Sequence, residues 1–252
     1  YFLHQVSRRR RLRAALVVAI VRSCCAILGS QSRGALLALV GMAFVLALKG
    51  KRPIQMSLLL GTLIVSAALF MPESWTARMG TIKTYEADSS AMSRISTWKT
   101  LWNLALDRPL VGGGFGSDNA AVFAAYAPER VGDYVGGAVL VAHSIYFQAL
   151  GEHGFPGLLL YLLLGFFTWK KAAEIAKKTE KDAELATWVP LLMRMVQVSL
   201  VGFAIGGAFL SLVYFDLPYY IIGYVVLVDA TLREREKSNL ISQPPKNKTI
   251  TV

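Results

Sequence analysis

The sequence has few of the residues that build disulfide frameworks and metal sites. It holds two cysteines and three histidines in 252 residues. The cysteines, Cys24 and Cys25, are adjacent within an apolar run, which predicts no disulfide framework. No Cys/His cluster has zinc-site spacing, and the glycine-rich run 112–116 lacks the Lys and Ser/Thr of a phosphate-binding loop. We therefore expect neither a metal nor a cofactor, and we interpret the 112–116 run as a tight turn.

Acidic residues are also scarce, with 16 Asp and Glu against 27 Lys and Arg and a formal net charge of +11. A basic excess of this size can indicate nucleic-acid binding. Here, however, the basic residues cluster beside apolar runs, as they do at the cytoplasmic ends of membrane helices. We therefore expect membrane lipids, and not nucleic acid, around this chain.

Long apolar runs are abundant: 54% of the residues are hydrophobic and the mean hydropathy is +0.46. A run of about 20 apolar residues spans the core of a bilayer. These runs lack the period-2 alternation of a membrane β-barrel, so the sequence predicts an all-α integral membrane protein. We expect six transmembrane helices, at about residues 14–31, 34–48, 54–71, 144–169, 188–213 and 217–231.

The distribution of charge predicts one orientation. Four stretches, at 8–13, 49–52, 170–181 and from residue 233 onward, hold 18 of the 27 Lys and Arg residues. Six crossings place all four on the same side, which is the cytoplasm by the positive-inside rule. The long stretch 72–142 then lies outside, and in a bacterium it would be a periplasmic loop over the inner membrane.

These patterns predict a single polytopic membrane domain over residues 1–252. Residues 72–142 form its large periplasmic loop, and the polar residues 232–252 form a disordered cytoplasmic tail. Because the chain begins at Tyr1 without a signal peptide, we interpret it as the C-terminal part of a longer protein whose earlier helices are missing.

Within the loop, apolar residues at helical spacing predict an amphipathic helix over about 91–106, lying on the membrane surface. Interfacial anchoring is the simpler interpretation of Trp98 and Trp102, although Trp98 is also a candidate substrate-binding residue. Arg94 is harder to explain structurally, because a cation near a helix N-terminus opposes the helix dipole. It is therefore a candidate functional residue.

Two arginines lie at or within apolar segments. The segment after Arg33 has 14 residues, about 21 Å of helix, against a bilayer core of about 30 Å. Arg33 is thus drawn toward the outer membrane boundary, where it either snorkels to water or binds an anion such as phosphate. Arg22 lies near the middle of the first segment and should face protein or a cavity.

His143 marks the border between the loop and the fourth segment. It is either structural or a general base, since imidazole titrates near neutral pH. On a straight helix, Tyr146 shares its face, whereas Gln148 and Glu152 share another face toward the bundle interior. Glu152 should not orient His143 unless Pro156 and nearby glycines distort the helix.

Together these motifs resemble the O-antigen ligase / Wzy polymerase superfamily. They are Ser32-Arg33-Gly34 opening a helix, Arg94-x3-Trp98 followed by Pro109-x2-Gly112-x-Gly114, and His143-Ser144-x9-Gly154-x2-Gly157. The resemblance covers about residues 14–230. The stretch from Arg78 to Arg94 also resembles the O-glycosylation ligases linked to exosortase systems.

The resemblance implies a fold like that of GT-C glycosyltransferases and an inverting, metal-independent transfer of a glycan. The donor would be an undecaprenyl-diphosphate-linked glycan, and the acceptor a hydroxyl of a lipid, a glycan or a protein. The implied catalytic residues are His143, Arg33 and Arg94. We expect substrate contacts from Arg22, Trp98, Tyr146, Gln148 and Glu152.

Several alternatives share this chemistry or this location. A polysaccharide polymerase or a protein O-oligosaccharyltransferase would use the same donor with a different acceptor. A glycan transporter or a membrane scaffold would not be an enzyme. A transporter should show broken helices in paired repeats, and the sequence shows no internal repeat.

Overall fold

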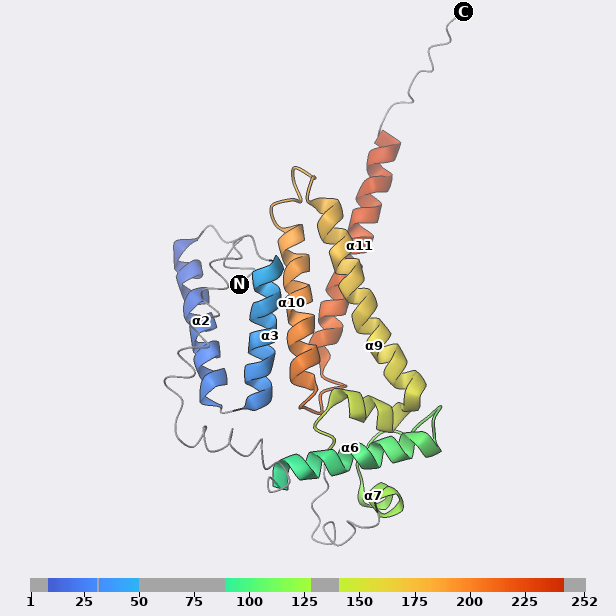
Figure 1. Cartoon of the computed structure of the whole chain (residues 1–252). Helices are drawn as coiled ribbons and strands as arrows, with labels where there is room; N and C mark the ends of the chain where they lie inside the picture. The colour runs from blue at the N-terminus through green and yellow to red at the C-terminus, as the bar shows by residue number, and fades with distance from the viewer. Residues whose placement is uncertain (1–8, 31, 50–88, 128–140, 243–252) are drawn as a thin grey trace, which may run out of the picture. The chain divides into compact units, whose positions relative to one another are not determined.

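The computed structural model describes residues 9–30, 32–49, 89–127 and 141–242. Every regular element in these ranges is a helix, as predicted (Figure 1). The helices are α2 (Arg10–Gly29), α3 (Arg33–Lys49), α6 (Ser89–Asp107), α7 (Ala120–Tyr126), α9 (Ile145–Thr179), α10 (Val189–Gly207) and α11 (Asp216–Ser242). The predicted third transmembrane segment, 54–71, lies outside the described residues.

The chain divides into two compact units, residues 1–215 and residues 216–252. In the first unit, α10 packs against both α3 and α9, and α6 packs against α9 and α7. Glycines allow α3 and α10 to approach closely, because a Cβ at Gly41 would lie 2.2 Å from Ile205 and one at Gly202 would lie 2.4 Å from Met42. The second unit consists, in its described part, of α11.

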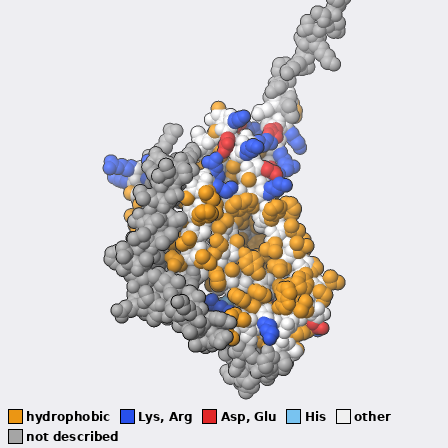
Figure 2. Space-filling view, viewed as in Figure 1, with side chains coloured by type: hydrophobic (Ala, Val, Ile, Leu, Met, Phe, Trp, Pro, Cys, Tyr) orange, Lys and Arg blue, Asp and Glu red, His pale blue; other side chains and the backbone are white. Residues whose placement is uncertain are grey.

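Two of the described helices, α9 and α10, are long and apolar enough to cross a membrane, and α3 is a shorter apolar helix. Large apolar side chains on α9 are exposed, among them Leu160 at 68% and Phe166 at 58%. Figure 2 shows apolar side chains over a broad area of the visible face. Exposed apolar surface of this kind is typical of helices that contact lipid.

The predicted amphipathic helix is present as α6, and its buried face is Leu101 and Leu104, each 1% exposed. These residues pack with Ala142, just before α9. Trp102, 45% exposed, lies among apolar residues that face outward. Thus α6 packs one apolar face on protein and leaves further apolar side chains exposed.

Three helices end elsewhere than the predicted segments do. Helix α9 continues past residue 169 to Thr179, because Lys, Ala and Glu favour helix and Lys171 pairs with Glu174 at 3.0 Å. Helix α10 ends at Gly207 instead of continuing to 213, and residues 208–215 form turns. A Gly-Gly pair at 206–207 is a poor helix interior, which explains the early end.

The third difference concerns the stretch from residue 232 onward, which we expected to be a disordered tail. Helix α11 continues to Ser242, and residues 243–252 lie outside the described range. The polar residues of this stretch are good helix formers, since Arg, Glu and Lys lose little rotamer freedom in a helix. Arg233 also pairs with Asp229 at 2.7 Å, one turn earlier.

Candidate functional site

His143 lies just before α9, in a strained backbone conformation. Its φ of 45° is the only positive value among the described residues other than glycine. Its N–H donates to Ser211 Oγ at 2.8 Å, and its side chain is exposed. A non-glycine residue keeps such a conformation only where its surroundings fix it, often at functional sites. Because His143 is outside the helix, the predicted helical face shared with Tyr146 was wrong.

Trp98 of α6 contacts the chain on both sides of His143. Its Nε1–H donates to the carbonyl of Ala142 at 2.7 Å. Its ring stacks on Phe147 of α9, with centroids 5.0 Å apart and planes within 5°. Trp98 is therefore half-buried within protein, whereas Trp102 is 45% exposed and meets Phe155 edge-on at 5.7 Å.

The structure brings Arg94 close to His143. Arg94 precedes Trp98 by one turn of α6, so both residues lie on the same helix face. Burial, and secondly the positive charge of Arg94, lower the pKa of His143 below its usual value. A lowered pKa favours the neutral imidazole, which is the form in which a histidine acts as a general base.

The other two candidate arginines, Arg33 and Arg22, have no described side-chain contact near His143. Arg33 begins α3, and its side chain is outside the described part. Its neighbour Gly34 is buried against Phe209, which a Cβ at position 34 would approach to 2.9 Å. The backbone at Arg33 therefore reaches the same turn, residues 208–215, that binds His143 through Ser211. Arg22 lies in the middle of α2 with an exposed side chain, and no described contact brings it to this group.

The 208–215 turn is an element that the sequence did not reveal, because we assigned it to a membrane helix. Besides Ser211, it contributes the N–H of Val213, which donates to Gln148 Oε1 at 3.4 Å. Tyr146 donates its hydroxyl to Ala204 O, near the end of α10, at 2.8 Å. The Gly206-Gly207 pair was the available signal for this turn.

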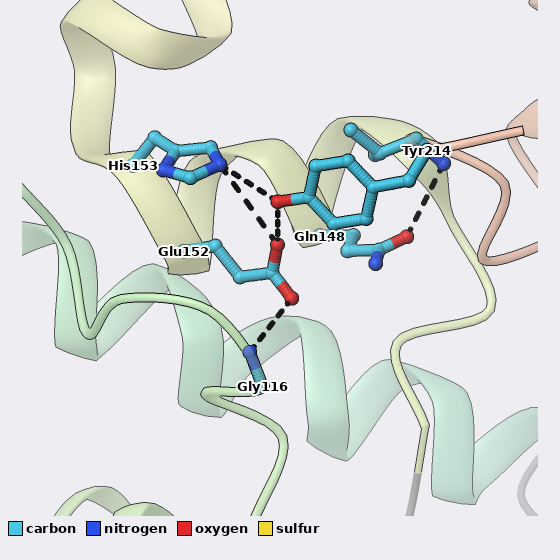
Figure 3. Close-up of polar contacts among 6 residues, drawn as sticks. Gly116, Gln148, Glu152, His153 and Tyr214 are labelled. Atoms are coloured by element: carbon cyan, nitrogen blue, oxygen red, sulfur yellow. Dashed lines mark hydrogen bonds and ion pairs between the residues drawn. The ribbon is translucent and has the colours of Figure 1, made fainter. Parts of the chain in front are cut away.

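Glu152 is buried, 4% exposed, in a cluster with Gly116, His153 and Tyr214, here called the Glu152 cluster (Figure 3). Gly116 N–H donates to Glu152 Oε1 at 3.2 Å, and the Tyr214 hydroxyl donates to Oε2. His153 Nε2 lies 2.7 Å from the Tyr214 hydroxyl oxygen. As expected, Glu152 and Gln148 share a face, because both contact the 208–215 turn, and no described contact joins Glu152 to His143.

The tight turn predicted at residues 112–116 is confirmed, and together with residues 109–111 it is here called the glycine turn. Gly112, Gly114 and Gly116 have φ values of 61°, 81° and 69°. A Cβ at Gly112 would lie 2.5 Å from the carbonyl oxygen of Gly151, so only glycine fits there. The turn therefore docks directly on α9.

At this contact α9 kinks and exchanges its own hydrogen bonds for bonds to the glycine turn. Gly154 is non-helical, with φ 67° and ψ −167°, and Pro156 follows it. Pro156 has no N–H to donate to the carbonyl of Glu152, four residues earlier. Gly114 N–H donates to that carbonyl instead, at 3.0 Å. Gly113 N–H likewise binds Gly151 O at 2.8 Å, while Phe155 N–H binds Pro109 O at 2.9 Å.

Asp118 is a further residue near His143 that the sequence did not single out. Its carboxyl accepts a hydrogen bond from the backbone N–H of Ala142, which opposes a rise in pKa. Burial nevertheless raises the pKa of Asp118, and the nearby charge of Glu152 adds to the rise. Asp118 thus ties the end of the glycine turn to the residue before His143.

Comparison with known proteins supports one family. The family model described as O-antigen ligase matches residues 4–162, more than half of the chain. The matched region includes α2, α3, α6, the glycine turn and the kinked start of α9, whereas the 208–215 turn lies beyond it. No curated protein and no solved structure matches the chain.

Proposed function

Because the chain belongs to the O-antigen ligase family, we propose that it transfers a glycan from an undecaprenyl-diphosphate-linked donor to an acceptor hydroxyl. Members of this family carry out ligase- or polymerase-type glycan transfer. The observation that carries the proposal is the position of Arg94 beside His143: Arg94 lies one turn before Trp98 on α6, Trp98 binds the residue before His143, and the charge of Arg94 contributes to the lowered pKa of the imidazole. This arrangement supplies a base for the acceptor and a positive charge for the leaving group.

The proposed reaction is a single displacement. The acceptor oxygen attacks the anomeric carbon of the donor while its proton passes to the imidazole of His143. The bond from that carbon to the phosphate oxygen breaks, and the electron pair leaves with undecaprenyl diphosphate. Attack opposite to the leaving group inverts the anomeric centre.

The negative charge on the diphosphate grows as this bond breaks. Fixed cations directed at that charge stabilise the transition state, more strongly where water is scarce. Arg94 and Arg33 are the proposed ligands, because guanidinium binds phosphate oxygens in pairs. Arg22 remains a weaker candidate, since its side chain is exposed on α2 in the described part of the chain.

The four remaining predicted substrate-binding residues all make hydrogen bonds within this chain. They are Trp98, Tyr146, Gln148 and Glu152. Of these, Trp98 lies closest to the chemistry, because it fixes the residue before His143. In the proposed enzyme these side chains shape the site, and any contact with substrate is in addition to that role.

The proposed location is the bacterial inner membrane, with His143 facing the periplasm. Helices that can cross a membrane support a membrane location, and the clustering of Lys and Arg supports this orientation. We further propose that the transfer needs no metal ion, so that chelators such as EDTA leave its rate unchanged.

The proposal is tested in a deletion strain complemented with the complete protein. His143→Ala and Arg33→Ala should abolish transfer while the protein still inserts at normal levels. Arg33→Lys should restore part of it, because lysine keeps the charge but loses the paired donors. Lys99→Ala is the matched control, since Lys99 is an exposed cation on α6. Full transfer by both alanine variants would refute the assignment.

The products distinguish the acceptors. A ligase defect leaves unligated lipid-linked glycan, a polymerase defect leaves short chains, and a defect in a protein O-oligosaccharyltransferase leaves bare protein. A transporter defect would leave the lipid-linked glycan on the cytoplasmic side, and loss of a scaffold would not depend on His143.

A further inference from the structure

The Glu152 cluster is more firmly tied to protein than a substrate ligand would be. Glu152 has a side chain that is 5% exposed, and each of its oxygens accepts a hydrogen bond from another segment. A buried carboxylate that accepts a hydrogen bond on each oxygen has its hydrogen-bonding capacity met by protein. Removing one donor leaves a buried acceptor unpaired, which costs more free energy than the net gain of a typical hydrogen bond. This arrangement suits a structural tie.

The hydrogen bonds of the cluster have a fixed direction. The Tyr214 hydroxyl has one proton, which it donates to the carboxylate of Glu152. With that proton used, the hydroxyl oxygen can only accept from His153 Nε2, 2.7 Å away, which requires the tautomer protonated at Nε2. Phe115 covers the outside, edge-on to His153 at 4.9 Å and against Tyr214 at 5.5 Å.

Two short paths lead from this cluster to His143. Through Tyr214, the path runs back three residues to Ser211, whose Oγ accepts the N–H of His143. Through Gly116, it runs forward two residues to Asp118, whose carboxyl accepts the N–H of Ala142. The two paths therefore end on adjacent residues, and both act on the strained backbone of His143.

We propose that Tyr214 and His153 are positioning residues, which act with Glu152 to hold the glycine turn and the 208–215 turn together and thereby place His143. This inference rests on the proposed function for the reaction that His143 performs. It adds residues to that reaction, including Tyr214, which lies beyond the region matched by the family.

The first test is Tyr214→Phe, which keeps the ring against Phe115 and removes the hydroxyl. Transfer at saturating donor should fall by roughly tenfold, the effect of losing one hydrogen bond to a charged group, while the KM for donor stays the same. Tyr220→Phe is the matched control, because Tyr220 is 65% exposed. A raised KM at unchanged kcat would overturn the proposal, because it would make Tyr214 a substrate ligand.

Variants of His153 and a double variant of Ser211 and Tyr214 give a second test. His153→Phe should lower kcat less than Tyr214→Phe does, and His153→Gln should restore part of the loss by supplying an N–H donor. In a Ser211→Ala background, Tyr214→Phe should have less than its full effect, because both changes loosen the same turn. Strictly multiplicative effects would contradict the proposal.

A measurement without activity separates this inference from the proposed function. Hydrogen exchange of residues 141–144 and 116–118 should be faster in Tyr214→Phe than in the wild type or in Tyr220→Phe. Unchanged exchange there overturns the positioning role even if transfer is observed. A wild type that transfers no glycan refutes the proposed function, and the exchange result still decides whether the cluster holds these segments.

Discussion

The two ends of α3 lie in polar surroundings of opposite kinds. At the Lys49 end, regular helices present paired side chains: Lys49 Nζ donates to Gln197 Oε1 at 2.8 Å and lies 4.8 Å from the centre of the Trp169 ring. Gln197, 1% exposed, also donates to the carbonyl of Trp169 at 3.1 Å. At the Arg33 end, the chain leaves helical geometry, and backbone groups form many of the ties around His143.

The two ends of α3 therefore differ in role: the Lys49 end contributes to stability, and the Arg33 end contributes to the reaction. At the Lys49 end the polar groups are occupied by one another, which stabilises the contact among α3, α9 and α10. At the Arg33 end the irregular backbone is held by its neighbours, which leaves the exposed side chain of His143 beside a cation. Changes at the first end should therefore alter unfolding, and changes at the second should alter the rate of transfer.

After the changes at His143 and Arg33, which should abolish transfer, the largest effect is expected from Arg94→Ala, with transfer falling about 100- to 1000-fold through loss of charge stabilisation. The change should also shift the pH dependence of the rate in a definite direction. Arg94 lowers the pKa of His143, so removing it raises that pKa toward the usual value. The acid side of the pH–rate profile should then move to higher pH. A lower rate with an unmoved profile would contradict this coupling.

The second prediction compares two glycines of α9. Gly154→Ala places a Cβ 2.4 Å from Pro109 O at a positive φ, which should cost on the order of 1–3 kcal/mol of unfolding free energy. Gly165→Ala meets no atom within 4 Å and should stabilise the helix by up to about 1 kcal/mol. Thermal unfolding in detergent measures both, and equal midpoints would show that the kink is not required.

Trp98→Phe should have a smaller effect on transfer. Phenylalanine keeps the stacking on Phe147 and loses the bond to Ala142 O, so we expect a roughly fivefold lower rate from one lost hydrogen bond. Trp102→Phe is its control on the same helix, because Trp102 is 45% exposed. A larger loss in the control would place the important tryptophan on the exposed face.

The smallest effect on transfer is expected at the opposite end. Lys49→Met leaves Gln197 Oε1 without its donor, which should cost about 1–3 kcal/mol of stability. The rate per folded molecule should stay at the wild-type value. A tenfold lower rate at unchanged stability would remove the contrast between the two ends.

Local sequence patterns predicted the helices well, but they could not predict the contacts between segments that are far apart in the chain. The spacing of apolar residues located α6 to within two residues, and helical periodicity placed Gln148 and Glu152 on one face. The sequence could not reveal that residues 208–215 form a turn bound to His143, because those bonds depend on segments more than 60 residues away. The left-handed backbone of His143 has the same origin.

The kink of α9 also has a consequence for membrane insertion. The N–H of Gly113 binds the carbonyl of Gly151, and the N–H of Gly114 binds the carbonyl of Glu152, so both donors come from outside the helix. A helix with unserved carbonyls at Gly151 and Glu152 would be costly in an apolar environment. The bend of α9 therefore needs the glycine turn as well as Pro156, because the helix can enter an apolar environment with these carbonyls satisfied only while the two segments are in contact.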